Sequence, residues 1–313
     1  MSLLLADHRG LGLAALAPAL VRQGFAVTAC ETVAETRAAL AQGHFNLVLL
    51  DPLAIGGAEA ELVARTGPRA PRAVLLVTGS GPLPAAARVP ELRGLPFDLA
   101  RRDAGLEEFV WRLERLLEQN QLRGELQRVR YEAQHDDRTG LLRPAPFQRR
   151  VREHFSAAQR HGLPLALVLI DLDRFGRVNK DFDHTIGDEL IARTGAVVQR
   201  CLRAEDVAAR LGGDEFAVVL PYTQPVDAAR VIQRLLGEIH GLSCDVTRPD
   251  GTHAPLAVSG SIGFETCDGR DLETAEVLRR NAEGALRAAK ARGGNTAVYF
   301  RSLEHGAPEP STA

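Results

Sequence analysis

The chain reads Leu211-Gly-Gly-Asp-Glu-Phe-Ala-Val-Val-Leu220 at its most informative point, with two glycines and two carboxylates between apolar segments. We expect two strands here, joined by a tight turn at Gly212 and Gly213, because glycine tolerates positive φ and leaves room for a ligand. Asp214 and Glu215 are then displayed at the turn rather than buried. Paired glycines alone indicate no more than a hairpin. The two acids beside them predict a site for a metal ion.

Further motifs stand on both sides of this stretch. They are Asp136-Asp-Arg-Thr-Gly-Leu141, Leu165-Ala-Leu-Val-Leu-Ile-Asp-Leu-Asp-Arg-Phe175, Asn179, His184, Gly187-Asp188, Val258-Ser-Gly-Ser-Ile-Gly263, and Ala289-Lys290 with Gly293 and Asn295. In this order they resemble the GGDEF family, the diguanylate cyclases that join two GTP molecules into cyclic di-GMP with release of pyrophosphate. The resemblance runs from about Asp136 to Tyr299. It implies an α+β, nucleotidyl-cyclase-like domain over 136–303, with a central, mainly antiparallel sheet.

The apolar run before Asp171 lacks alternation, which predicts a strand buried on both faces with this acid at its end. Phosphoryl transfer depends on positioning and on cations that neutralise phosphate charge. Carboxylates and substrate phosphates together suit Mg²⁺. By resemblance, the metal ligands for Mg²⁺ or Mn²⁺ are Asp171, the main-chain carbonyl of Leu172, Asp214 and Glu215. The last two are also the candidate catalytic acids, and Asp214 is the candidate to activate the attacking 3′-hydroxyl.

The same resemblance implies which residues bind the substrate. Asn179 and Asp188 match the positions that read guanine, and Gly212, Gly213 and Lys290 match further positions that contact GTP. A carboxylate accepts hydrogen bonds from N1 and N2 of guanine, and an amide both donates and accepts. Asp188 therefore favours GTP over ATP. Out of context, the first two residues are equally typical of a helix cap and a first-turn acid.

A second ligand site is indicated upstream of the turn. Arg203-Ala-Glu-Asp206 matches the RxxD inhibitory site of the family, six residues before Gly212. An arginine fork with a carboxylate can hold the phosphate and the guanine of a cyclic dinucleotide. Cyclic di-GMP is therefore expected to bind here and restrain the enzyme, although the tetrad alone is common by chance.

Two departures from the family pattern leave the activity open. Gly176 and Gly294 stand where the family usually has phosphate-binding lysine and arginine. Since a charged hydrogen bond contributes about 1.5 to 3 kcal/mol, their loss weakens the reactive complex by about two to four powers of ten unless other cations replace them. Nearby candidates are Arg174, Arg177, Lys180 and Arg292. An active cyclase and a weak or inactive protein that senses cyclic di-GMP or GTP for a protein partner both remain open. Synthesis of a mixed cyclic dinucleotide is a third alternative, against which Asp188 argues.

The first 104 residues form a separate pattern. Apolar segments at 3–5, 26–29, 47–50 and 74–77 alternate with helical ones, which predicts a doubly wound parallel sheet. Asp7, Asp51, Thr78 and Arg101 follow strands, where such sheets bind ligands. The arrangement resembles the receiver domain of response regulators, with Asp51 as phosphoacceptor candidate beside Asp7 and Thr78. Only one acid follows the first strand, so a receiver phosphorylated by a sensor kinase and a degenerate dimerisation or protein-binding module both stay open.

Residues 105–135 are expected to form a helical linker. They contain no proline and are rich in Leu, Glu, Arg and Gln. An apolar stripe at heptad spacing predicts a coiled coil, and its members are Leu106, Phe109, Leu113 and Leu116, then Leu122, Leu126 and Val129 in shifted register. A homodimer has a functional reason, because two GTP molecules must face each other. The alternative is a helix whose apolar face packs on its own domain.

Composition is that of an ordinary cytoplasmic protein. The 313 residues suffice for two cores, and the formal net charge of −2 gives no electrostatic case for nucleic acid or membrane surfaces. No apolar run reaches the length of a membrane span, and the first residues lack the cationic region of a signal peptide. The four cysteines show no metal-binding or disulfide spacing and are expected to be free thiols. Residues 304–313 are expected to be a disordered tail.

Overall fold

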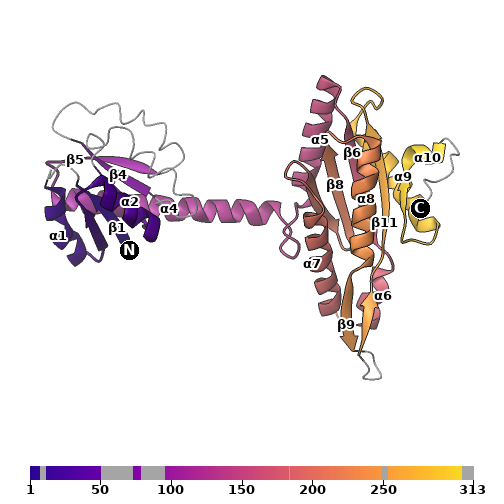
Figure 1. The fold of residues 1–313 in the computed structure, drawn as a ribbon, viewed down its shortest axis with the longest axis horizontal. Coiled ribbons are helices and arrows are strands. Elements are labelled where there is room, and N and C mark those ends of the chain that lie inside the picture. Colours follow the sequence, from indigo (N-terminus) through magenta and orange to yellow (C-terminus); the bar gives the residue numbers. More distant parts are fainter. Residues whose placement is uncertain (8–11, 51–72, 79–95, 183, 248–252, 305–313) are drawn as a thin grey trace. The chain divides into compact units, whose positions relative to one another are not determined.

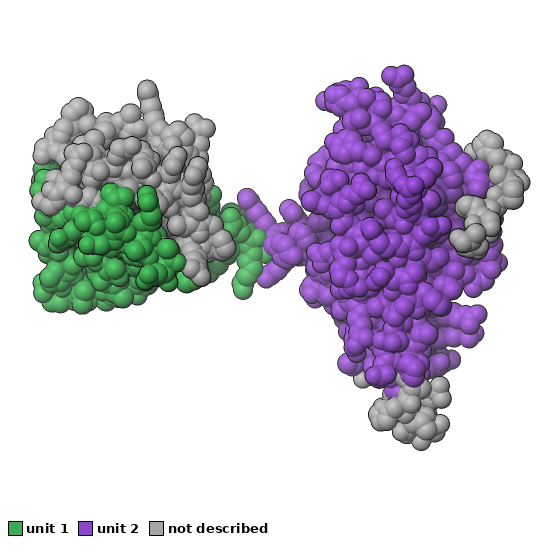
Figure 2. Space-filling view, in the orientation of Figure 1, with its two compact units in different colours: residues 1–128 green, residues 129–313 purple. Residues whose placement is uncertain are grey.

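The computed structural model describes residues 1–7, 12–50, 73–78, 96–182, 184–247 and 253–304. The chain divides into two compact units, residues 1–128 and 129–313, which Figure 2 shows in different colours. Among the described residues, no helix is both long and apolar enough to span a membrane.

Unit 1 contains a five-stranded parallel sheet in the order β2-β1-β3-β4-β5. Figure 1 labels its strands β1, β4 and β5. Its strands are β1 (Ser2–Ala6), β2 (Ala26–Cys30), β3 (Leu47–Leu50), β4 (Ala73–Thr78) and β5 (Phe97–Arg101). The first helical segments are η1 (Leu13–Leu16), α1 (Ala17–Arg22) and α2 (Val33–Gln42). This strand order is that of doubly wound receiver-like folds. The sequence prediction of the fold is confirmed here.

The apolar runs of unit 1 are strands because both sides of the sheet are covered. Leu3 and Leu5 belong to one buried cluster, and Leu4 belongs to the cluster on the other side. A capping box starts α2, where the Thr32 side chain accepts a hydrogen bond from the Glu35 nitrogen at 3.2 Å. Such burial on both faces explains why the strands lack polar alternation.

The predicted receiver positions are only partly described. Asp7 follows β1, is buried, and accepts a hydrogen bond from the Ala14 nitrogen at 3.1 Å. Thr78 ends β4, and Arg101 ends β5 with its guanidinium 2.9 Å from Asp103. Asp51 lies outside the described residues. Its role as a phosphoacceptor therefore stays a prediction.

Helix α4 (Leu106–Gln134) crosses the boundary between the units. Phe109, Leu113 and Leu116 are buried in the core of unit 1, so the first half of the predicted coiled-coil stripe packs on its own domain. Leu122 and Leu126 remain 59% and 49% exposed. This second half is the part of the stripe that is available to a partner helix.

Unit 2 is built on a five-stranded sheet in the order β12-β11-β6-β8-β7. Its strands are β6 (Leu165–Leu172), β7 (Val207–Gly212), β8 (Glu215–Pro221), β11 (Gly260–Cys267) and β12 (Ala297–Tyr299). Only the β11–β12 pair is parallel, which confirms the mainly antiparallel sheet. A separate hairpin joins β9 (Ser243–Thr247) and β10 (His253–Ala257).

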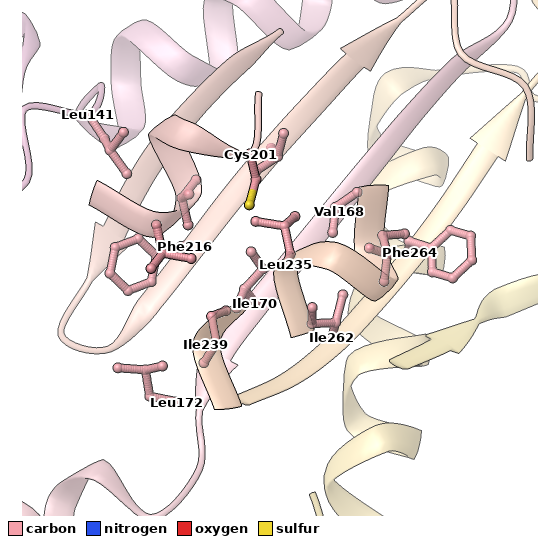
Figure 3. Packing of buried hydrophobic residues seen from close by; sticks show 14 of the residues in the cluster. Leu141, Val168, Ile170, Leu172, Cys201, Phe216, Leu235, Ile239, Ile262 and Phe264 are labelled. Carbon is pink, nitrogen blue, oxygen red and sulfur yellow. The ribbon is translucent and has the colours of Figure 1, made fainter. Parts of the chain in front are cut away.

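Helices cover both faces of this sheet. They are α5 (Pro144–His161), α6 (Phe175–Asp181), α7 (His184–Arg200), α8 (Pro225–His240), α9 (Ala275–Ala291) and α10 (Phe300–Glu304). Figure 3 shows one core, in which Val168 and Ile170 of β6 meet Leu235 and Ile239 of α8. Leu167 of the same strand points to the opposite core, with residues of α5 and α9. Strand β6 is thus buried on both faces, as its apolar sequence predicts, and Asp171 lies near its end.

Candidate active site

The glycine-rich turn joins β7 to β8. Gly212 pairs with Glu215, so the two-residue loop consists of Gly213 and Asp214, and the expected turn at Gly212-Gly213 was one residue too early. The shift follows from a register irregularity between Arg210 and Gly212, which leaves an extra residue in β7. Gly213 has φ +49°, a conformation that glycine adopts without strain. Asp214 is half-buried and Glu215 is exposed, so both acids are displayed at the turn.

The carboxylates of β6 and of the turn lie together. Asp171 is directly opposite Glu215 in the antiparallel pair β6–β8, and the nitrogen of Leu172 donates to the Asp214 carbonyl at 3.3 Å. Burial raises the pKa of Asp171, the Lys290 ammonium 2.6 Å away opposes this effect, and the negative charges of Asp214 and Glu215 add to it. Three neighbouring acids with one ammonium make an environment that favours another cation.

A pocket of about 550 Å³ opens beside these acids. Its lining brings together Asp171, Leu172, Asp173, Arg174, Phe175, Gly176, Asp214, Lys290, Gly293 and Gly294. The volume lies in the range of small-molecule sites. Gly176 and Gly294, which stand where the family has cations, therefore line the pocket. Of the four nearby cations that could replace them, Arg174 is in the described lining.

Asp173 has a structural role that the sequence did not reveal. Its carboxylate accepts hydrogen bonds from Ser259 Oγ at 2.7 Å, Ser261 Oγ at 2.6 Å and the Asn295 nitrogen at 2.7 Å. It thereby holds the loop after α9 against the end of β6. Gly294 has φ +82°, and a methyl group there would lie 2.6 Å from Asp173 Oδ1. A side chain at position 294 would therefore require Asp173 or this loop to move.

The acids suit a metal ion that the substrate helps to bind. Among the residues that the structure describes, no three His, Cys, Asp or Glu side chains are placed to hold a metal by themselves. Mg²⁺ commonly uses one or two carboxylates with waters and substrate phosphates. Asp171 lies opposite Glu215 on the neighbouring strand and lines the same pocket as Asp214. The donor set therefore fits a hard divalent cation.

The two predicted base-reading residues lie on α6 and α7, where Asn179 approaches the residue before Asp188. A methyl group at Gly187 would lie 2.0 Å from Asn179 Oδ1 and 3.2 Å from Phe175, so both side chains of α6 rest on this glycine. Asp188 follows it on α7. Arg138 Nη1 lies 2.9 Å from Asp188 Oδ1, a contact that the sequence analysis missed.

A hydrogen-bonded chain ties the opening motif to the turn. Asp136 accepts hydrogen bonds from the nitrogen and hydroxyl of Thr139 at 3.0 and 2.8 Å and pairs with Arg210 at 3.2 Å. Arg210 in turn donates to the Gly213 carbonyl at 3.0 and 2.8 Å. Although burial raises the pKa of Asp136, the Thr139 hydrogen bonds and the Arg210 charge bring it below its ordinary value. The acid at the start of the motif is therefore a structural anion that supports the turn.

The predicted inhibitory residues line a second pocket of about 270 Å³. The Arg203 nitrogen donates to Asp206 Oδ2 at 2.9 Å, and the Arg203 side chain is exposed. Burial raises the pKa of Asp206, and this hydrogen bond partly opposes it. The pocket is large enough for part of a nucleotide, and product binding here stays a prediction.

Known proteins with similar sequences match the second unit. Diguanylate cyclase DgcP from Pseudomonas aeruginosa is 31% identical over 168 residues, which are 54% of this chain and 24% of DgcP. Response regulator PleD from Caulobacter vibrioides is 34% identical over 137 residues, 44% of this chain and 29% of PleD. The chain thus spans less than a third of either relative.

A solved structure gives a similar result. The coiled coil and GGDEF domain of DgcB from Caulobacter crescentus, crystallised with c-di-GMP, align with a TM-score of 0.55 and 26% identity, covering 63% of this chain and 100% of that one. A family model described as "Diguanylate cyclase, GGDEF domain" matches residues 133–296. That match includes the carboxylate pocket, the positions predicted to read the base and the RxxD residues, and the chain belongs to the GGDEF family.

Proposed function

We propose that this protein is a diguanylate cyclase that condenses two GTP molecules into cyclic di-GMP and two pyrophosphates, as a homodimer with Mg²⁺ or Mn²⁺. The observation that carries the proposal is the meeting of Asp171 with the Gly213-Asp214 turn in one pocket. Asn179 and Asp188, gathered where α6 packs on α7, support guanine as the base.

In the proposed reaction, the 3′-hydroxyl of one GTP attacks the α-phosphorus of the other, and pyrophosphate leaves. The Asp214 carboxylate accepts the hydroxyl proton at a turn that Arg210 holds through the Gly213 carbonyl. Lys290 and Arg174, both lining the pocket, bind phosphate oxygens in place of the cations missing at 176 and 294. Asp171, the carbonyl of Leu172, Asp214 and Glu215 would hold a divalent cation, which neutralises phosphate charge. A second attack in the opposite sense closes the ring.

Dimerisation is part of the proposal because each subunit binds one of the two GTP molecules that react. Each nucleotide supplies both a 3′-hydroxyl and an α-phosphate, so two bound GTP molecules must face each other. The exposed residues Leu122, Leu126 and Val129 of α4 offer an apolar stripe for the helix of a second copy.

Regulation is proposed at two places. Cyclic di-GMP binding at Arg203 and Asp206 restrains the enzyme, because the pocket there combines an exposed guanidinium with a half-buried carboxylate. The receiver-like unit passes a signal from a protein partner, with Asp51 as the acceptor if that partner is a sensor kinase.

The second candidate function is a cyclic di-GMP or GTP sensor without turnover. It is favoured by Gly176 and Gly294, which line the pocket and leave it with fewer cations than the family pattern has. Under this alternative, nucleotide binds but no product forms.

Purified full-length protein, stripped of nucleotide, tests the proposal when it is incubated with GTP and Mg²⁺ and the products are identified by mass spectrometry. Wild type should form cyclic di-GMP, and Asp214→Asn should abolish it. Asp245→Asn is the matched control, because Asp245 is exposed on β9 and does not line the pocket. Binding of GTP without product in a dimeric sample would support the sensor instead.

A further inference from the structure

Arg138 holds the carboxylate that is expected to read guanine. Its Nη1 lies 2.9 Å from Asp188 Oδ1, with the two side chains 47% and 46% exposed. The residue lies in the opening motif, between Asp136 and Thr139. An arginine paired with the acid that is expected to read the base adds hydrogen-bond donors to the base site.

The position of Arg138 is defined by its neighbours in the chain. Asp136 accepts two hydrogen bonds from Thr139, and these bonds join the residues of the loop that lie before and after Arg138. Thr139 is buried and packs on α7, where a methyl group at Gly195 would lie 2.6 Å from its Cβ. Asp188 lies two helical turns before Gly195 on the same helix and hence on the same face. The loop therefore presents Arg138 along the face of α7 that carries Asp188.

The base site also contains Asn179, which rests on Gly187 next to Asp188. Guanine presents three adjacent groups at its edge: the N2 and N1 hydrogens, which are donors, and O6, which is an acceptor. A carboxylate satisfies the two donors but cannot donate to O6. A planar guanidinium beside that carboxylate supplies the missing donor, and arginine is well suited to guanine O6.

We propose that Arg138 is a specificity-determining residue that donates a hydrogen bond to guanine O6 while Asp188 accepts from N1 and N2. The inference rests on the proposed function, since it concerns the base of the same GTP. Adenine carries an amino donor at position 6 and an acceptor at N1, so the same pair meets it with mismatched groups. Arg138 and Asp188 together thus favour guanine more strongly than Asp188 alone.

The proposal differs from two simpler accounts of the contact. An exposed ion pair without a ligand role contributes about 0 to 1 kcal/mol of stability and does not affect base choice. An arginine that merely competes with the base for Asp188 would weaken GTP binding, so its removal would tighten it. The three accounts differ in the effect of removing the donors of Arg138. The proposal predicts weaker GDP binding, an arginine that competes with the base predicts tighter binding, and an ion pair without a ligand role predicts no change.

Isothermal titration of the full-length protein with GDP, 6-thio-GDP and ADP in Mg²⁺ separates them without turnover. Arg138→Met keeps the length of the side chain and removes its donors, and Arg138→Lys keeps the charge without the fork. Arg230→Met is the matched control, because Arg230 forms an exposed 2.9 Å ion pair with Asp227 on α8. Circular dichroism checks that every variant is folded.

Arg138→Met should bind GDP about ten- to a hundred-fold more weakly, the range expected for a charged hydrogen bond, with ADP unchanged and Arg138→Lys in between. Wild type should lose about ten-fold on 6-thio-GDP, whose sulfur is a poor acceptor, and Arg138→Met should lose little more. Unchanged or tighter GDP binding by Arg138→Met would overturn the proposal. If the wild-type protein does not prefer GDP over ADP, that result contradicts the guanine site of the proposed function, and this inference fails with it.

Discussion

Gly176 and Gly294 replace two family cations, but the structure makes them unequal. A Cβ added at Gly176 would meet no atom within 4 Å, whereas one at Gly294 would meet Asp173, whose carboxylate is held by Ser259 and Ser261. Gly294 also has φ +82°, which costs other residues about 1 to 3 kcal/mol. The first position can accept a cation again, and the second cannot.

Gly176→Lys is therefore expected to tighten GTP binding about ten-fold, because it restores a charged contact at the pocket. Gly294→Lys should lower the free energy of unfolding by about 1 to 3 kcal/mol without tightening binding. Titration with GTP in Ca²⁺ and urea unfolding measure the two effects. Gly176→Ala controls for the gain in helix propensity, and equal behaviour of the two lysine variants would contradict this account.

Gly187 is the contact point of Asn179, one of the two residues proposed to read the base. Because a methyl group there would lie 2.0 Å from Asn179 Oδ1, Gly187→Ala should displace Asn179 and weaken GDP binding about ten-fold. Gly237→Ala on α8, where nothing lies within 4 Å, should leave binding unchanged. Calorimetric titration of both variants tests this, and wild-type affinity in Gly187→Ala would mean that Asn179 does not bind the base.

At the scale of elements, the opening loop and the β7–β8 turn are one structural unit. Asp136 and Arg210 are only 14% and 11% exposed, and Arg210 also holds the Gly213 carbonyl. Removing one partner leaves the other charge without compensation in a largely buried place.

Arg210→Met should accordingly lower the free energy of unfolding by about 2 to 4 kcal/mol and reduce cyclase activity, since the turn that carries Asp214 loses its support. Arg200→Met removes the exposed pair with Glu238 and should cost less than about 1 kcal/mol. Urea unfolding gives both values. A similar cost for the two variants would show that the Asp136–Arg210 pair does not support the turn.

Sequence patterns predicted the elements better than the contacts between them. The resemblance to the family placed Asp171, Asp214 and Glu215 in one site, and in the structure Asp171 lies opposite Glu215 and lines a pocket with Asp214. The turn was placed one residue early because a bulge in β7 has no local sequence signal. The Arg138–Asp188 pair joins a loop to a helix fifty residues away in the chain, a distance that no period or motif encodes.

At the scale of the whole molecule, α4 contains two different apolar stripes. The heptad pattern showed a shift of register between them but not which one packs on a domain, because residues that face a domain core and residues that face a partner helix share the same spacing. Leu113 belongs to the core of unit 1, so its substitution would disturb that fold, whereas Leu122 and Leu126 are exposed.

Leu122→Lys combined with Leu126→Lys should convert the proposed homodimer to monomer and abolish product formation while GDP binding remains, because each subunit keeps its own nucleotide pocket. Gln127→Lys adds one positive charge to another face of α4 and should leave the proposed dimer intact. Analytical ultracentrifugation and calorimetry report the two properties. A dimer that survives the double substitution would assign dimerisation to another surface.

The most direct test of the cyclase is the fate of an equimolar mixture of unlabelled and fully ¹⁵N-labelled GTP. Incubated with the wild-type protein and Mg²⁺, it should yield cyclic di-GMP of which about half contains one labelled and one unlabelled base, together with pyrophosphate. That product would show that two separate GTP molecules are joined. Intact GTP bound to the protein, with no cyclic product of any mass, would contradict the account and leave a nucleotide sensor.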